Sequence, residues 1–122
     1  MEVTLEMYRR ELLKGSTETL LLAILTAKPM YGYQLAREMD TRSSGYFRLK
    51  EGTLYPALHR LERDEMIKGK WRPSPHGQAR RYYYITGVGR KRLESMLQEW
   101  GRFTKAVNLV AHREAFSVGV SE

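Results

Sequence analysis

Apolar residues recur at helical spacing along most of the chain, which predicts a largely helical fold. Residues 3–14 mix apolar and charged positions and are expected to form a short leading helix that ends at Gly15. A second helix should start where Ser16 or Thr17 supplies the N-cap, because a side-chain oxygen there accepts a free backbone N–H. Residues 20–25 are apolar on almost every side. A helix of that kind is expected at the centre of the core.

The second helix should end at Lys28-Pro29, because the residue before a proline resists the helical conformation. A third helix is expected from Tyr31 to Arg42, since apolar and polar positions fall on opposite faces there. The Ser-Ser-Gly sequence at 43–45 closes this helix, and residues 46–50 form a connecting loop. The apolar face consists of Tyr31, Leu35, Ala36 and Met39, and the polar face of Gln34, Arg37 and Glu38.

A fourth helix, from about residue 52 to 64, has a core stripe at i, i+4 and i+7 formed by Leu54, Leu58 and Leu61. The opposite face holds Gly52, Pro56, His59 and Arg63, with Arg60 beside them. Proline is tolerated in a first turn but not in a helix interior. Either Thr53 is therefore the N-cap, or the helix starts earlier and bends. We expect the start between Lys50 and Thr53.

Two segments rich in β-forming residues, 67–72 and 80–85, flank a turn-forming sequence at 73–78. This pattern predicts a hairpin. Tyr82-Tyr83-Tyr84 alternates between its two faces, so at least one tyrosine should lie in the core and one is free to contact phosphate. A hairpin after a pair of helices is typical of a winged helix-turn-helix. The alternative is a purely structural hairpin with a hydrated basic face.

A last, long helix is expected after Thr86, which is suited to cap it. Apolar residues along it are spaced 3, 4, 3, 4 and 3, the a/d seam of a coiled coil: Leu93, Met96, Trp100, Phe103, Val107 and Val110. The apolar surface of this seam is larger than one thin domain can cover, so we expect the seam to pack on a partner helix. The alternative is packing on the first helices of the same chain. Residues 111–122 lose the periodicity and are expected to form a flexible tail.

Composition narrows the class of protein. The chain has 122 residues, enough for one domain with a modest core, and no apolar run long enough to cross a membrane. It lacks an N-terminal signal-peptide pattern and has no cysteine, which suits a cytoplasmic location. The net charge is +7, and residues 66–93 hold eight Lys and Arg residues without an acid. This cluster favours a polyanionic partner over a surface tuned only for solubility. A basic ribosome-associated protein is a further alternative.

The fourth helix offers chemistry suited to duplex DNA. Gly52 and Pro56 carry no bulky side chain, so the positive helix end could approach a phosphate closely. Thr53 and Tyr55 supply hydroxyls for phosphate oxygens. The cationic side chains reach guanine or phosphate, but this face has no Asn or Gln for adenine, so we expect modest direct readout supplemented by DNA shape. The alternative is that these are ordinary solvated positions. The side chains that could reach guanine or phosphate from this face are His59, Arg60 and Arg63.

An enzymatic function is the hypothesis that the sequence supports least. The three histidines are isolated, no paired carboxylates share a plausible cleft, and no glycine-rich phosphate loop is present. Gly87-Val88-Gly89 is too short to be one. We therefore expect no catalytic residue, no metal site and no cofactor.

Several motifs together resemble the PadR family of bacterial transcriptional regulators, from Gly15 to about Val110. They are Tyr31-Gly32-Tyr33 at a helix start, Gly52-Thr53-Leu54-Tyr55-Pro56-Ala57-Leu58, Arg60-Leu61-Glu62, and Arg81-Tyr82-Tyr83-Tyr84-Ile85-Thr86. The resemblance implies a homodimeric repressor that binds an inverted-repeat operator and often controls detoxification or efflux genes. It also implies that Tyr31 and Thr53-Leu54-Tyr55 contact DNA.

The single C-terminal helix is similar to that of the small subfamily, which includes multidrug-responsive repressors. In those relatives an aromatic residue of the dimerisation helix lines a cavity between subunits, and Trp100 falls at the matching place. The resemblance thus implies a planar aromatic or phenolic effector beside Trp100; the alternative, equally supported, is that Trp100 is a core residue of the dimer interface. Further candidates for the cavity walls are Phe103, Met96, Tyr8 and Met7. The chain departs from the family at Glu65 or Met66, where many relatives have glycine, and at Gly87, where an acid often follows the capping residue.

The sequence therefore predicts a mainly α protein with a β-hairpin (α+β): a winged helix-turn-helix at 1–85, a C-terminal dimerisation helix at 86–110 and a tail. The expected DNA-binding residues are Tyr31, Gln34, Lys50, Gly52, Thr53, Tyr55, Pro56, His59, Arg60, Arg63, Lys68, Lys70, Arg72, Arg80 and Arg81. The expected partners are double-stranded DNA, a second copy of the chain and a small-molecule effector, with no membrane. The alternative function is a winged-helix module that binds a protein or RNA without an effector.

Overall fold

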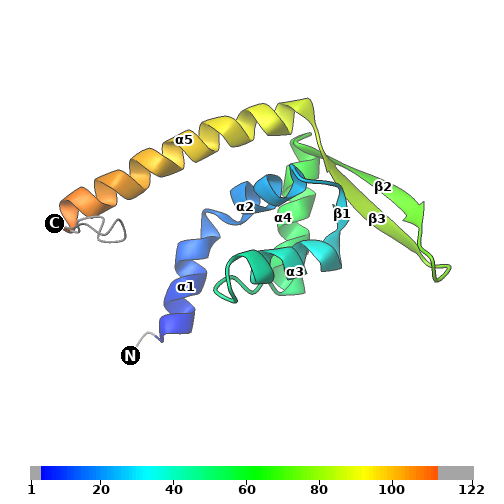
Figure 1. Ribbon diagram of the computed structural model, residues 1–122, viewed down its shortest axis with the longest axis horizontal. Coiled ribbons are helices and arrows are strands. Elements are labelled where there is room, and N and C mark those ends of the chain that lie inside the picture. The colour runs from blue at the N-terminus through cyan, green and yellow to red at the C-terminus, as the bar shows by residue number, and fades with distance from the viewer. Residues whose placement is uncertain (1–3, 113–122) are drawn as a thin grey trace.

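The computed structural model describes residues 4–112, which form five helices and a small antiparallel sheet (Figure 1). The leading helix α1 (Leu5–Lys14) is capped by Thr4, whose hydroxyl accepts a hydrogen bond from the Met7 amide at 3.1 Å. Residues 113–122, which hold most of the expected tail, lie outside the described residues. None of the described helices is both long and apolar enough to cross a membrane.

Helix α2 (Thr17–Leu25) lies at the centre of the core, as its apolar sequence predicts, and Leu21 and Leu22 are fully buried. Two details of its ends differ from the prediction. Ser16 occupies the N-cap position without making a capping hydrogen bond, and Thr17 instead donates its hydroxyl proton to the Leu13 carbonyl at 3.1 Å. The helix also ends at Leu25, before the proline that was expected to stop it.

A two-residue strand, β1 (Met30–Tyr31), precedes α3 (Gly32–Arg42) and was not predicted. Two residues are too few to show the alternation that identifies a strand from sequence. The strand exists because it pairs with the distant β3, Met30 with Tyr83 and Tyr31 with Tyr82. It ties the start of α3 to the hairpin.

Helix α4 (Glu51–Arg63) has Lys50 at its N-cap, so the start falls within the predicted interval and Thr53 is not the N-cap. Pro56 therefore lies in the second turn, where its missing N–H leaves the Gly52 carbonyl without its helical partner. The core stripe is confirmed, since all three of its leucines are buried, and Ala57 extends it: Leu54, Leu58 and Leu61.

The hairpin is confirmed as β2 (Ile67–Pro73) and β3 (Ala79–Ile85), with sheet order β1-β3-β2. Directly paired residues share a face of the sheet, and faces alternate along each strand. One face therefore carries the pairs of Lys68 with Tyr84, Lys70 with Tyr82, and Arg72 with Arg80. The opposite face carries Ile67 with Ile85, Gly69 with Tyr83, and Trp71 with Arg81.

Helix α5 (Gly87–Val110) has Thr86 as its N-cap, as predicted, and the Thr86 hydroxyl accepts a hydrogen bond from the Gly89 amide at 3.0 Å. The same hydroxyl lies 2.8 Å from the Glu65 carbonyl oxygen, to which it is a donor. Leu93 is buried in the core and Met96 packs against it. Beyond these residues α5 extends away from the other elements along the top of Figure 1. The first two seam positions thus pack within the chain.

Candidate nucleic-acid interface

The outward surface of α4 is the one predicted from its periodicity. The residues opposite the leucine stripe are all exposed: Gly52, Thr53, Tyr55, Pro56, His59, Arg60 and Arg63. Apart from the adjacent residues and the backbone of its own helix, no atom lies within 4 Å of the position that a Cβ would take on Gly52. The amino-terminal half of α4 is therefore a smooth, accessible helix end, where the positive end of the helix dipole faces solvent.

Tyr55 connects α4 to the start of α3. Its ring fills the space in which a side chain on Gly32 would lie, with the hydroxyl 2.3 Å from the position of a Cβ. One residue earlier, the Tyr31 amide donates a hydrogen bond to Gln34 Oε1 at 3.2 Å. Gln34 thus caps α3 through its oxygen. The Tyr55 ring thus packs against the start of α3.

The outer face of the hairpin concentrates positive charge over aromatic rings. Lys70 lies 5.3 Å from the centre of the Tyr84 ring and Arg72 lies 4.3 Å from that of Tyr82. Arg80 lies 4.4 Å from the centre of the Tyr31 ring and donates to the Tyr31 hydroxyl at 2.9 Å. This set is called the wing cations below and comprises Lys68, Lys70, Arg72 and Arg80.

The wing cations form no ion pair with the described part of the chain. No carboxylate of residues 4–112 lies within 4.0 Å of any of them. Aromatic faces orient these side chains without cancelling their charge. The wing cations are therefore available to anionic groups such as phosphates.

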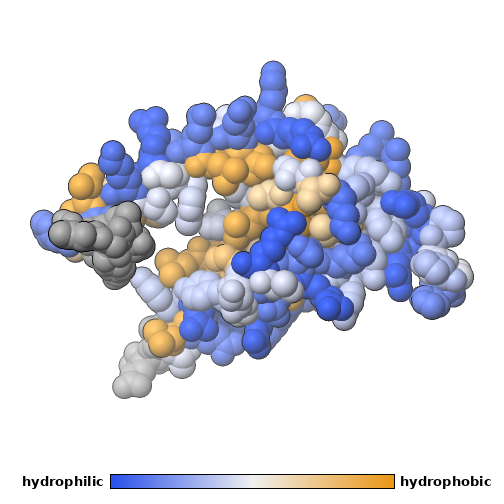
Figure 2. All heavy atoms as spheres, in the orientation of Figure 1, coloured by the Kyte–Doolittle hydropathy of each residue, from blue (hydrophilic) through white to orange (hydrophobic). Residues whose placement is uncertain are grey.

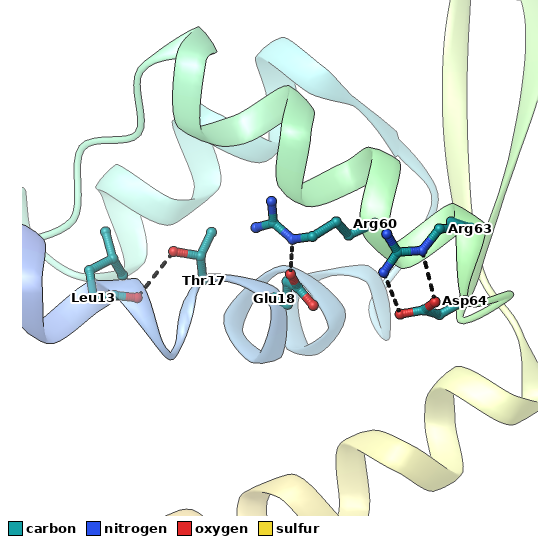
Figure 3. Close-up of polar contacts among 6 residues, drawn as sticks. All are labelled: Leu13, Thr17, Glu18, Arg60, Arg63 and Asp64. Carbon is teal, nitrogen blue, oxygen red and sulfur yellow. Dashed lines mark hydrogen bonds and ion pairs between the residues drawn. The ribbon is translucent and has the colours of Figure 1, made fainter.

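Three other cations that the sequence assigned to DNA form ion pairs within the chain. Arg60 donates to Glu18 of α2 at 2.6 Å, and Arg63 donates to Asp64 at 3.1 Å, both drawn in Figure 3. The hydrogen bond from Arg63 to Asp64 raises the pKa of the guanidinium. Arg81 donates to Glu62, and both side chains are about one-third exposed.

The tyrosine run divides as its alternation predicts. Tyr83 is buried on the core side of the sheet, and burial raises the pKa of its hydroxyl above the ordinary tyrosine value. Tyr82 and Tyr84 lie on the outer face beneath the wing cations. Both tyrosines contact cationic side chains there, and a phosphate contact by either one stays a prediction.

The residues expected to form an effector pocket lie on two separate helices. Trp100 and Phe103 are neighbours on α5, with ring centres 5.7 Å apart and planes tilted by 30°. Met7 and Tyr8 lie on α1. A groove of about 1090 Å³ between α1 and residues 45–50 includes Met7 in its lining but not Trp100. Within one chain the structure therefore does not join these two groups.

Sequence reasoning missed three residues that organise this surface. Glu18 and Glu62 hold arginines that had been assigned to DNA, and Trp71 is exposed on the hairpin near Arg81. The Arg60–Glu18 pair joins residues 42 positions apart, so no local spacing indicates it. For Glu62, the available signal was an acid on a helix that directly precedes a basic hairpin.

The helix pair α3–α4 followed by a hairpin and a basic surface defines a winged helix-turn-helix, a DNA-binding fold. The pattern of the transcriptional regulator PadR-like family matches residues 21–95. The chain therefore belongs to the PadR-like family of transcriptional regulators. It is a DNA-binding regulator and not an enzyme.

Individual relatives agree with this assignment. A transcriptional regulator of Mycobacterium tuberculosis is 33% identical over 84 residues, which cover 69% of this chain and 75% of that protein. A PadR-like transcriptional regulator from Bacillus cereus is 33% identical with a TM-score of 0.72, covering 85% of this chain and 99% of that one. A transcriptional regulator from Clostridium thermocellum is 30% identical with a TM-score of 0.75, covering 80% and 95%.

Proposed function

We propose that the protein is a homodimeric, effector-responsive repressor that binds an inverted-repeat operator of detoxification or efflux genes. It acts in the cytoplasm, where such operators lie. One observation carries the proposal: the apolar seam on the outer half of α5 is exposed among the described residues.

The dimer follows from the exposed seam of α5. Beyond Met96, its members are exposed to between 45% and 80%: Trp100, Phe103, Val107 and Val110. Figure 2 shows apolar atoms on the side of α5 that is turned toward α1, across an open space. Large exposed apolar patches on a protein surface mark interaction sites. The heptad spacing fits a second copy of the same helix.

The DNA contacts follow from the geometry of α4 and the hairpin. We place the exposed amino-terminal half of α4 in the major groove, where the open space at Gly52 permits close approach. The wing cations then reach phosphates of the flanking duplex. In a symmetric dimer the two α4 helices read half-sites about 34–36 Å apart, which is one turn of DNA.

The effector site is proposed beside Trp100, where the neighbouring Phe103 ring supplies a second aromatic surface. Dimerisation would enclose these rings, with Met96 at the inner end and Met7 and Tyr8 of α1 as further walls. A planar aromatic molecule stacks favourably on such surfaces. It shifts the spacing of the reading helices only if its affinities for the two dimer states differ.

The dimer is tested by two matched substitutions on α5. Phe103 and Val88 are 56% and 55% exposed, but only Phe103 belongs to the seam. In sedimentation equilibrium, F103E should give a monomer because a charge in an apolar interface is unpaired. V88E should remain a dimer, as should the unmodified protein. A monomeric unmodified protein, or a dimeric F103E, would contradict the proposal.

The effector site is tested with W71F, in which Trp100 is the one remaining tryptophan, since the chain has two. Adding the naphthalene dye ANS should quench Trp100 emission in the dimer and release the protein from an operator selected from random duplexes. F103E should show neither effect. Quenching without release would contradict an effector-responsive switch.

Repression is tested separately by in vitro transcription from a promoter that overlaps the selected operator. Transcription should fall when the protein is added, and a rise would contradict repression.

A further inference from the structure

The carboxylate of Glu62, in the last turn of α4, contacts both strands of the hairpin. Its Oε2 atom accepts a hydrogen bond from the Gly69 amide of β2 at 3.3 Å. The same atom accepts a hydrogen bond from the Arg81 guanidinium of β3. One carboxylate oxygen therefore joins α4, the proposed recognition helix, to the two strands that follow it in the chain.

The local sequence makes this arrangement possible. The sheet order places β2 at an edge, so the Gly69 amide has no partner on a further strand. Arg81 crosses over Gly69 to reach Glu62, and a Cβ on Gly69 would lie 2.5 Å from its guanidinium carbon. The exposed Trp71 ring flanks the same guanidinium at 5.8 Å. A side chain at position 69 would displace Arg81 from Glu62.

We propose that Glu62 is a positioning residue that holds the wing against the recognition helix, and that Arg81 acts through Glu62 instead of through DNA. Arg81 lies on the opposite face of the hairpin from the wing cations, so Arg81 does not face the phosphates that the wing cations face. Fixing the base of the hairpin sets the angle at which the wing cations meet the duplex. The inference rests on the DNA-binding activity of the family and does not require the dimer.

Electrostatics and positioning predict opposite outcomes for the loss of Glu62. Removing an acid from a DNA-binding surface strengthens attraction to phosphates, and would also release Arg81 to contact them. If Glu62 instead positions the wing, removing its charge weakens DNA binding. The sign of the change therefore separates the two roles.

The experiment measures affinity for a duplex selected from a random pool, using the full chain and the variants E62Q, R81Q and E62Q/R81Q. Each single variant should bind about tenfold more weakly, equivalent to about 1.4 kcal/mol. The double variant should be no weaker than either single one, because both break the same contact. G69A, which keeps both charges and displaces Arg81, should show the same loss, and R81K should retain most of the affinity.

Two further readouts separate positioning from general damage to the fold. Hydroxyl-radical footprints of E62Q should lose protection of the flanks, which the wing covers, and keep protection of the half-sites read by α4. The salt dependence of R81Q should keep the slope of the unmodified protein. Tighter or equal binding by E62Q would overturn the inference. A slope of log affinity against log salt concentration that is reduced by about 0.9 in R81Q would also overturn it, because such a reduction marks a lost phosphate contact. Failure of the unmodified protein to bind any selected duplex would instead contradict its DNA-binding function.

Discussion

Single residues decide how closely the elements of this protein approach one another. Gly32 and Gly89 lie where a Cβ would overlap a neighbour, Tyr55 in the first case and the Met66 carbonyl oxygen in the second. Glu65 shows the reverse situation. It adopts a φ of +61°, in the left-handed region that favours glycine, although it carries a side chain. This explains why glycine is expected near this position in the family.

The contact between Gly32 and Tyr55 leads to a prediction about DNA binding. In G32A the new Cβ displaces the Tyr55 ring, whose hydroxyl is the end of a movable side chain, so the free energy of unfolding should change by only about 0.5 kcal/mol. The displaced ring should still weaken binding to a selected duplex severalfold in fluorescence anisotropy. G15A is the control, because the space around Gly15 is open. Unchanged affinity in G32A would show that Tyr55 plays no part.

Glu65 leads to a prediction about stability. It follows the C-cap Asp64 of α4, and the Met66 amide bonds the Leu61 carbonyl at 2.9 Å, which is a Schellman motif with glutamate at the usual glycine position. E65G should relieve the left-handed strain and raise the free energy of unfolding by about 1 kcal/mol. Thermal unfolding at fixed protein concentration measures this. E65A keeps the Cβ and should show no gain; an equal gain would indicate that lost charge, and not backbone conformation, is responsible.

At the scale of elements, periodicity predicted every helix and the hairpin. Periodicity could not predict the features that depend on contacts between residues far apart in the sequence. The strand β1 exists through its pairing with β3, and the pairing of Arg60 with Glu18 depends on α2 and α4 packing together. The start of α5 has Gly87 where an acid often follows the capping residue in the family, and the hydrogen bonds of Thr86 to Glu65 and Gly89 hold that start in place.

The start of α5 gives a prediction at this scale. A Cβ on Gly89 would lie 2.1 Å from the Met66 carbonyl oxygen, and that atom belongs to the backbone and cannot move alone. G89A should therefore lower the free energy of unfolding by about 3 kcal/mol and separate α5 from the hairpin base. G87A, two residues earlier in open space, should be neutral or stabilising. Urea denaturation compares the two, and equal stabilities would contradict the close packing.

At the scale of the whole molecule, the sequence predicted the winged helix and its basic surface but not how the cations divide. Periodicity places Arg60, Arg63 and Arg81 on surfaces, where they resemble DNA contacts. The structure pairs each with a carboxylate and leaves the wing cations unpaired among the described residues. Spacing is limited in the same way for α5. It predicts an apolar seam but does not show which seam residues are buried in the core of the same chain.

The central claim is that two copies, joined through α5, present two α4 helices to one operator. The most direct test is light scattering of the complex with a selected inverted-repeat duplex, combined with affinity measurements on the full site and on one half-site. We predict two chains per duplex and a preference for the full site of at least about 100-fold, because the second half-site is bound intramolecularly. One chain per duplex, with equal affinity for both duplexes, would contradict the account.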